Sequence, residues 1–69
     1  MLETMPISEK LKMLRDRRGL TLDELAEQTG LSRSALSNYE TNESKEVSQF
    51  ALVTLAKFYG VSTDYLLGL

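Results

Sequence analysis

Apolar residues recur along this chain at the three- and four-residue spacing of amphipathic helices, in short runs that end at glycines. The first run predicts a helix over residues 7–18, which Ser8 would cap and Gly19 would end. Its apolar face consists of Ile7, Leu11 and Leu14. Pro6 disfavours helix in the residue before it, so residues 1–6 are expected to form a frayed or disordered lead-in.

Residues 21–40 predict two short helices joined by a turn. Thr21 and Glu24 have the spacing of a capping box, and Gly30 stands where a helix ends in the left-handed conformation that glycine adopts without strain. Ser32 would cap the second helix. The residues expected to face the core are Leu22, Leu25, Ala26, Leu36 and Tyr39. The opposite face of the second helix is polar and carries Arg33, Ser34, Ser37 and Asn38.

The last third of the chain predicts two more helices. The longer one would begin after a Ser48 cap and run to about residue 59, with an apolar face formed by Leu52, Leu55, Ala56 and Tyr59. Ser62 or Thr63 would cap a short final helix. The residues expected to close the core from this helix are Tyr65, Leu66 and Leu67. Because no strand pattern is present, the sequence predicts one compact, all-α domain of five helices over residues 7–69.

Composition narrows the classes of function. The 69 residues include no Cys and no His, so disulfides, thiolate or imidazole metal sites and His-activated nucleophiles are not available. The acidic residues Asp23, Glu24 and Glu27 are most simply a solvated helix face. We therefore expect no enzyme, no metal, no cofactor and no small-molecule ligand. The sequence also lacks a long apolar run or a signal peptide, which makes the cytoplasm the expected compartment and a membrane partner unexpected.

The net charge of −2 and the pI near 5.0 are unusual for a nucleic-acid-binding protein. The charge is unevenly distributed, however: residues 1–18 hold five Lys or Arg against three Asp or Glu, a balance of +2, and the remaining residues balance at −4. The basic run in the first helix is either a solvated face or a surface for phosphate.

The segment 21–40 resembles the helix-turn-helix of the lambda-repressor-like family, also called XRE or Cro/cI. The resemblance rests on Ala26, on Gly30 four residues later, and on Leu36 and Tyr39 as the apolar anchors of the second helix. With the flanking segments LKMLRDRRGLTLDELA and LAKFYGVSTDYLL it covers about residues 7–67. It implies a bacterial or phage transcriptional regulator, and first of all a repressor, that binds a specific sequence of double-stranded DNA as a homodimer.

In this family the second helix of the motif, here about residues 32–40, lies in the DNA major groove with its N-terminal residues at the base edges. Arg33 has the planar fork that binds O6 and N7 of guanine, and Asn38 could pair with adenine in the same way. Ser34 and Ser37 could each contact a base or a phosphate. The alternative for Arg33 is a contact to the DNA backbone only.

Contacts to the DNA backbone are expected from five positions: Arg15, Leu22, Ser32, Asn42 and Lys45. Leu22 would offer only its amide, whereas many relatives have a glutamine there whose side chain binds phosphate. The loop that follows Glu40 lacks the Asn-Gly turn of relatives and has Val47 where proline is common. These features argue against tight binding by an isolated monomer, which a dimer on two half-sites about one helical turn apart would offset. Because few cations face phosphate, we also expect weak non-specific binding and a modest dependence on salt.

The resemblance also implies an ion pair between Arg15 in the first helix and Glu40 at the end of the recognition helix. The pair would tie these two helices together and aim the guanidinium at a phosphate. Replacing the two residues should then have strongly non-additive effects on stability.

A set of apolar residues lies off the predicted core face or near the C-terminus: Phe50, Val53, Phe58, Leu66, Leu67 and Leu69. They are either an edge of the core or the contact surface of a dimer. A second function from a different class uses the same surface: a protein-interaction module of this fold, such as the partner-binding domain of an antitoxin. Such a module would have no use for Arg33. In similar proteins this point of the chain often leads into a linker and a second, regulatory or dimerising region.

Overall fold

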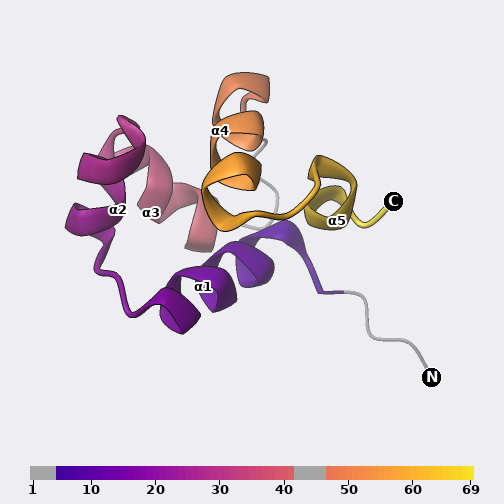
Figure 1. Ribbon diagram of the computed structural model, residues 1–69, viewed down its shortest axis with the longest axis horizontal. Helices are drawn as coiled ribbons and strands as arrows, with labels where there is room; N and C mark the ends of the chain where they lie inside the picture. The colour runs from indigo at the N-terminus through magenta and orange to yellow at the C-terminus, as the bar shows by residue number, and fades with distance from the viewer. Residues whose placement is uncertain (1–4, 42–46) are drawn as a thin grey trace.

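The computed structural model describes residues 5–41 and 47–69, which form five helices and no strand (Figure 1). The helices are α1 (Ile7–Arg18), α2 (Leu22–Thr29), α3 (Arg33–Thr41), α4 (Gln49–Tyr59) and α5 (Thr63–Leu67). The all-α fold and its five helices are confirmed, at bounds within a residue or two of those predicted. Most of the predicted lead-in, residues 1–4, lies outside the described residues.

The signals at the helix ends act largely as predicted. Thr21 and Glu24 form a complete capping box, in which the Glu24 amide donates to Thr21 Oγ1 at 3.1 Å and the Thr21 amide donates to Glu24 Oε1 at 2.8 Å. Ser48 caps α4 and, of the two residues proposed for α5, Ser62 is the cap. These caps satisfy amides that the first turn of a helix leaves without a partner.

The predicted Ser8 cap is wrong. Pro6 occupies the cap position in an extended conformation, and its carbonyl accepts from the amides of Glu9 and Lys10. Helix α1 therefore begins directly after the proline, whose fixed φ suits this position. Ser8 lies in the first turn of α1 with only 2% of its surface exposed, on the side that faces the core.

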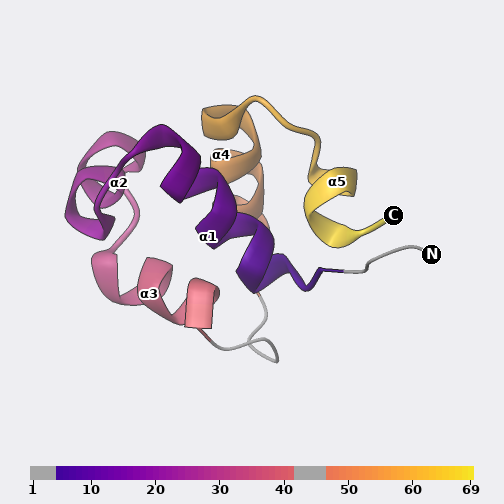
Figure 2. The ribbon, with the colours of Figure 1, turned by 90° about the horizontal axis from the view of Figure 1, so that it is seen from below.

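The helices surround one core. Helix α1 crosses the middle of the molecule, with α3 on one side of it and α4 and α5 on the other (Figure 2). Helix α2 packs against α3 and α4, and α5 packs against α1 and α4. The buried apolar residues are Leu11, Leu25, Leu36, Tyr39, Ala51, Leu55, Ala56, Tyr59 and Leu66. Every helix thus contributes to the core, and α2 and α3 lie at the opposite end of the long axis from α5 (Figure 1).

The expectation that three consecutive residues of α5 close the core holds for one of them. Leu66 is buried, whereas Tyr65 and Leu67 are 40% and 52% exposed. A helix of five residues makes little more than one turn, and neighbouring side chains project about 100° apart, so only one of the three faces the core.

None of the helices in residues 5–41 and 47–69 combines the length and the apolar composition that crossing a membrane requires. The same residues form no detectable pocket and no cluster of acidic side chains that could hold a metal ion.

Candidate nucleic-acid interface

The turn between α2 and α3 is built around Gly30. Its φ of 79° is left-handed, and its amide donates to the Ala26 carbonyl at 2.9 Å. The Thr29 hydroxyl donates to the Leu25 carbonyl at 2.8 Å and accepts from the Leu31 amide at 3.3 Å, which secures the chain on both sides of the glycine. This turn sets the direction in which α3 leaves α2.

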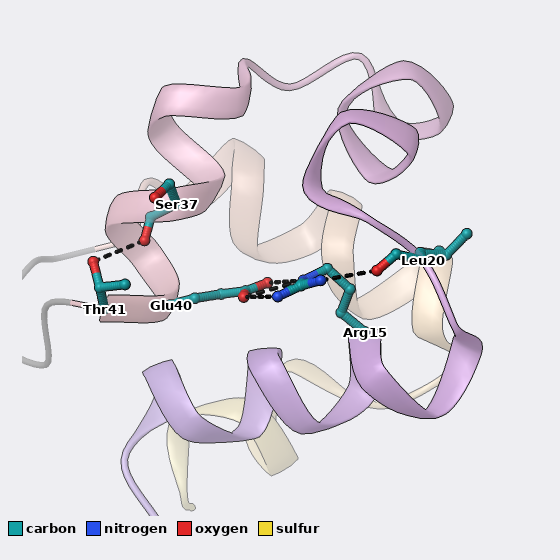
Figure 3. A network of polar contacts seen from close by, with 5 residues as sticks. All are labelled: Arg15, Leu20, Ser37, Glu40 and Thr41. Carbon is teal, nitrogen blue, oxygen red and sulfur yellow. Dashed lines mark hydrogen bonds and ion pairs between the residues drawn. The ribbon is translucent and has the colours of Figure 1, made fainter.

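Helix α3 has one face in the core and one face in solvent. Leu36 and Tyr39, at 1% and 9% exposure, hold it against the other helices. Of the residues predicted to read bases, Arg33, Ser34 and Asn38 are exposed. Ser37 is half-buried, and its carbonyl accepts from the Thr41 hydroxyl at 2.9 Å (Figure 3).

The starts of the two motif helices differ in charge. Ser32 caps α3, with its Oγ accepting from the Ala35 amide at 3.0 Å, and the first turn of α3 carries no acidic residue. The first turn of α2 carries Asp23 and Glu24. The Leu22 side chain packs against the core, so a DNA contact by its amide stays a prediction. Because free amides and the helix dipole attract anions, the start of α3 suits a phosphate better than the acidic start of α2.

The predicted ion pair between Arg15 and Glu40 is present and mostly buried. Arg15 Nε donates to both carboxylate oxygens at 2.9 and 3.1 Å, and Nη2 donates to Oε1 at 2.8 Å (Figure 3). The side chains are 14% and 5% exposed. Hydrogen bonding to Glu40 raises the pKa of Arg15 against the lowering effect of burial, so the guanidinium stays charged.

Arg15 also joins α1 to the segment that leads into α2. Its Nη1 donates to the Leu20 carbonyl at 2.8 Å (Figure 3). From α1, the Arg15 side chain therefore reaches both α3 and the start of the motif. Most of its N–H donors are used within the molecule. The phosphate contact suggested for Arg15 stays a prediction that relies on the donors that remain.

Two further cations of α1 also bind within the molecule, which the sequence did not indicate. Lys10 Nζ donates to the Tyr65 carbonyl at 2.7 Å and lies 4.9 Å from the centroid of the Tyr65 ring. Arg18 donates to the Phe58 carbonyl at 3.0 Å and lies over the Phe58 ring at 5.1 Å. The basic run of α1 thus splits: Lys12, Arg17 and Arg18 are exposed, Arg18 while bonded to Phe58, and Lys10 and Arg15 are partly buried. The two explanations offered for this basic run were a solvated face and a surface for phosphate. Neither of them applies to all five cations.

A second ion pair, also not foreseen, links the two motif helices. Arg33 Nε lies 2.7 Å from Asp23 Oδ1, with both side chains largely exposed. Asp23 belongs to the acidic face of α2 that composition suggested was simply solvated. Nothing in the sequence alone would identify the pair, because it depends on how α2 and α3 are placed by the turn.

The predicted apolar patch is smaller than expected. Leu66 is a core residue at 1% exposure. Phe58 is half-buried, packed edge-on against Tyr59 and covered by Arg18. The members that stay exposed are Phe50, Val53, Leu67 and Leu69. The predicted backbone-contact residues Asn42 and Lys45 lie outside the described residues.

Two short helices joined at a left-handed glycine, with a polar face on the second helix and a buried pair behind it, define a helix-turn-helix module. The sequence profile of the Helix-turn-helix family matches residues 11–66. The chain therefore belongs to the lambda-repressor-like helix-turn-helix family, as its sequence suggested.

Several relatives in this family can be compared directly. Over 61 residues the chain is 44% identical to the uncharacterized HTH-type transcriptional regulator YobD of Bacillus subtilis, covering 88% of this chain and 54% of that protein. Over 64 residues it is 39% identical to the HTH-type transcriptional regulator ImmR of the same organism, covering 93% and 50%. The chain thus spans about half the length of these relatives.

The fold also matches a DNA-bound protein. The P22 c2 repressor protein in complex with a synthetic operator superposes with a TM-score of 0.83 at 30% sequence identity, over 93% of this chain and 96% of that chain. The described helices are therefore arranged as in a domain that has been seen on its operator.

Proposed function

We propose that this chain is the DNA-binding domain of a transcriptional regulator and reads a specific duplex sequence with α3 in the major groove. The observation that carries the proposal is the two-sided character of α3. Leu36 and Tyr39 fix one face in the core, while Arg33, Ser34 and Asn38 are exposed on the other. A major groove about 12 Å wide admits one helix presented in this way.

Each exposed residue of α3 has a role that fits its chemistry. Arg33, the first residue of the helix, would donate two hydrogen bonds to a guanine, a contact worth about 1–3 kcal/mol of discrimination. Asn38, further along the same face, would pair with an adenine. Ser34 would contact a base or phosphate, and the half-buried Ser37 would do so only at its exposed edge.

Contacts to the DNA backbone would set the register of α3 in the groove. The amides at the start of α3, around Ser32, are the best-placed group, since none of the residues of that turn is acidic. The Leu22 amide, Asn42, Lys45 and the remaining donors of Arg15 would add to them. The small number of exposed cations predicts a shallow dependence of affinity on salt.

The proposed regulatory effect is repression, and the proposed place of action is the cytoplasm. A domain that only occupies a promoter needs no further surface to block transcription. The P22 c2 protein, whose fold this chain shares, is described as a repressor bound to operator DNA.

The proposed functional unit on DNA is a homodimer. A single domain makes few contacts, whereas two domains on half-sites about one helical turn apart would double them. Phe50 and Leu69, at 71% and 88% exposure, are the most prominent apolar groups available for such a contact. Phe50→Ser should therefore weaken dimer formation in sedimentation on operator DNA, whereas the neighbouring exposed Gln49→Ser should not; equal effects would remove Phe50 from the interface.

Selection of bound duplexes from a random pool tests DNA reading directly. Wild type should enrich one palindromic or half-site sequence, and Arg33→Ala should lose the enrichment at a guanine. Lys12→Ala removes an exposed cation from α1 and should lower affinity without changing the sequence selected. Failure of wild type to enrich any sequence would refute the proposal for this chain. The apolar residues of α4 would then favour the alternative, a module that binds a protein partner.

A further inference from the structure

Asp23 and Arg33 bring the first turns of α2 and α3 into electrostatic contact. Asp23 Oδ1 lies 2.7 Å from Arg33 Nε, and the two side chains are 78% and 60% exposed. The contact is on the Nε side of the guanidinium. It is an ion pair by distance and does not have the geometry of a hydrogen bond, and the terminal nitrogens, Nη1 and Nη2, make no hydrogen bond to any residue within 5–41 or 47–69.

This contact restricts how Arg33 can approach a base. A guanidinium can meet a pair of acceptors through its Nε edge or through the edge formed by Nη1 and Nη2. A carboxylate beside Nε obstructs the first edge to other acceptors and leaves the second edge open, whose two parallel donors match O6 and N7 of guanine. Arg15 differs, because Glu40 and the Leu20 carbonyl together use Nε, Nη2 and Nη1.

The charge of Asp23 has a separate effect on unrelated DNA. The carboxylate stands in the first turn of α2, where the helix amides would otherwise attract a phosphate. It also pairs with a cation that would otherwise be free to bind the DNA backbone at any sequence. Both effects lower the affinity for duplex of any sequence, so the gain in discrimination comes from the orientation of Arg33.

Building on the proposed function, we infer that Asp23 is a positioning residue that holds Arg33 in its guanine-reading orientation and thereby increases discrimination between the operator and other DNA. The residue makes no base contact in this role and acts only through Arg33.

The pair itself is tested in the free protein. The Nε–H resonance of Arg33 in a proton–nitrogen correlation spectrum should shift in Asp23→Asn. It should not shift in Glu27→Gln, which removes the same charge from an exposed position one turn further along α2. A resonance that does not respond to Asp23→Asn overturns the inference and leaves the proposed function untouched.

The effect on specificity is tested with the duplex that wild type selects and with a duplex in which the guanine lost in Arg33→Ala is replaced. The discrimination is the Kd for the altered duplex divided by the Kd for the selected duplex. Asp23→Asn should reduce it by a factor of about three, which corresponds to the upper part of the range of interaction energies for exposed ion pairs. Glu27→Gln should tighten binding to both duplexes and leave their ratio unchanged. In the Arg33→Ala background, Asp23→Asn should have no further effect on the ratio.

The outcomes separate the inference from the function on which it rests. If wild type selects no sequence, the proposed function and the inference both fail. If Arg33→Ala loses the guanine preference but Asp23→Asn behaves like Glu27→Gln, only the inference fails. If Asp23→Asn changes the preference at a different base, Asp23 reads that base directly and the positioning role is overturned.

Discussion

Replacement of Arg15 and Glu40 by apolar residues of similar size tests whether their ion pair holds the recognition helix on the rest of the domain. Removing one partner of a buried pair costs roughly 3–5 kcal/mol, because the other charge is left without compensation. A domain of 69 residues has a total stability of roughly 3–10 kcal/mol. Arg15→Met or Glu40→Leu alone should therefore remove much of the stability of this domain.

The two single variants should differ. Arg15→Met leaves the carboxylate of Glu40, which is 5% exposed, without a cation. Glu40→Leu leaves a guanidinium that is 14% exposed and keeps its hydrogen bond to the Leu20 carbonyl. Arg15→Met should therefore be the more damaging variant. The double variant removes both charges and their desolvation costs, and it should be close to wild type in stability.

The assay is urea unfolding followed by far-ultraviolet circular dichroism, with an osmolyte at equal concentration in all samples to keep the single variants folded. Arg17→Met, which removes an exposed cation from the same helix, is the control and should change stability by less than about 0.5 kcal/mol. If the two single losses add up to the loss in the double variant within about 0.5 kcal/mol, the pair does not couple α1 to α3 and the reasoning is refuted.

Three further predictions concern other parts of the fold. Gly30→Ala should lower the free energy of unfolding, measured by thermal unfolding, by about 1–2 kcal/mol because φ is 79°, although no atom crowds the site. Gly30→Asn should cost less, since asparagine tolerates the left-handed conformation better, and an alanine variant as stable as wild type would contradict this. The Tyr59 hydroxyl is buried without a hydrogen-bond partner among the described residues, so Tyr59→Phe should keep or raise stability at neutral pH, by up to about 1 kcal/mol. Burial raises the pKa of Tyr59 from 10.0 to about 12, so wild type should lose stability as pH rises between these values, and the phenylalanine variant should lose less; identical pH profiles would refute the assignment. Lys10→Met should speed amide hydrogen exchange in α5 and leave α3 unchanged, because Lys10 holds the Tyr65 carbonyl; unchanged exchange in α5 would argue against this contact.

The helix bounds could be predicted because local chemistry marks them. Gly30 and the Thr21 capping box are features of a few neighbouring residues, and they act in the structure as they would in a short peptide. Ser8 shows the limit of this approach. A serine near the start of an apolar run suits a cap, but Pro6 took that position and placed Ser8 on the same inward side as Leu11.

The candidate site was predictable only in part. The polar face of α3 follows from helical periodicity, and the pair between Arg15 and Glu40 followed from the family resemblance. The contacts of Asp23 with Arg33 and of Lys10 with Tyr65 depend on how separate helices are placed in space. Charged residues look alike in a sequence whether they point into solvent or bind a neighbouring helix, which is why the apparent basic face of α1 was misleading.

The internal use of Lys10, Arg15 and Arg18 bears on how the proposed regulator would find its target in a genome. Non-specific affinity grows with the number of phosphates that cations neutralise, and here Glu40 neutralises Arg15 while backbone carbonyls tether Lys10 and Arg18 and restrict their reach toward a phosphate. Such a protein would slide only briefly on unrelated DNA and would search mainly by repeated encounters from solution. Because the vast number of competing genomic sites would then sequester few molecules, a small copy number would suffice to keep the operator occupied.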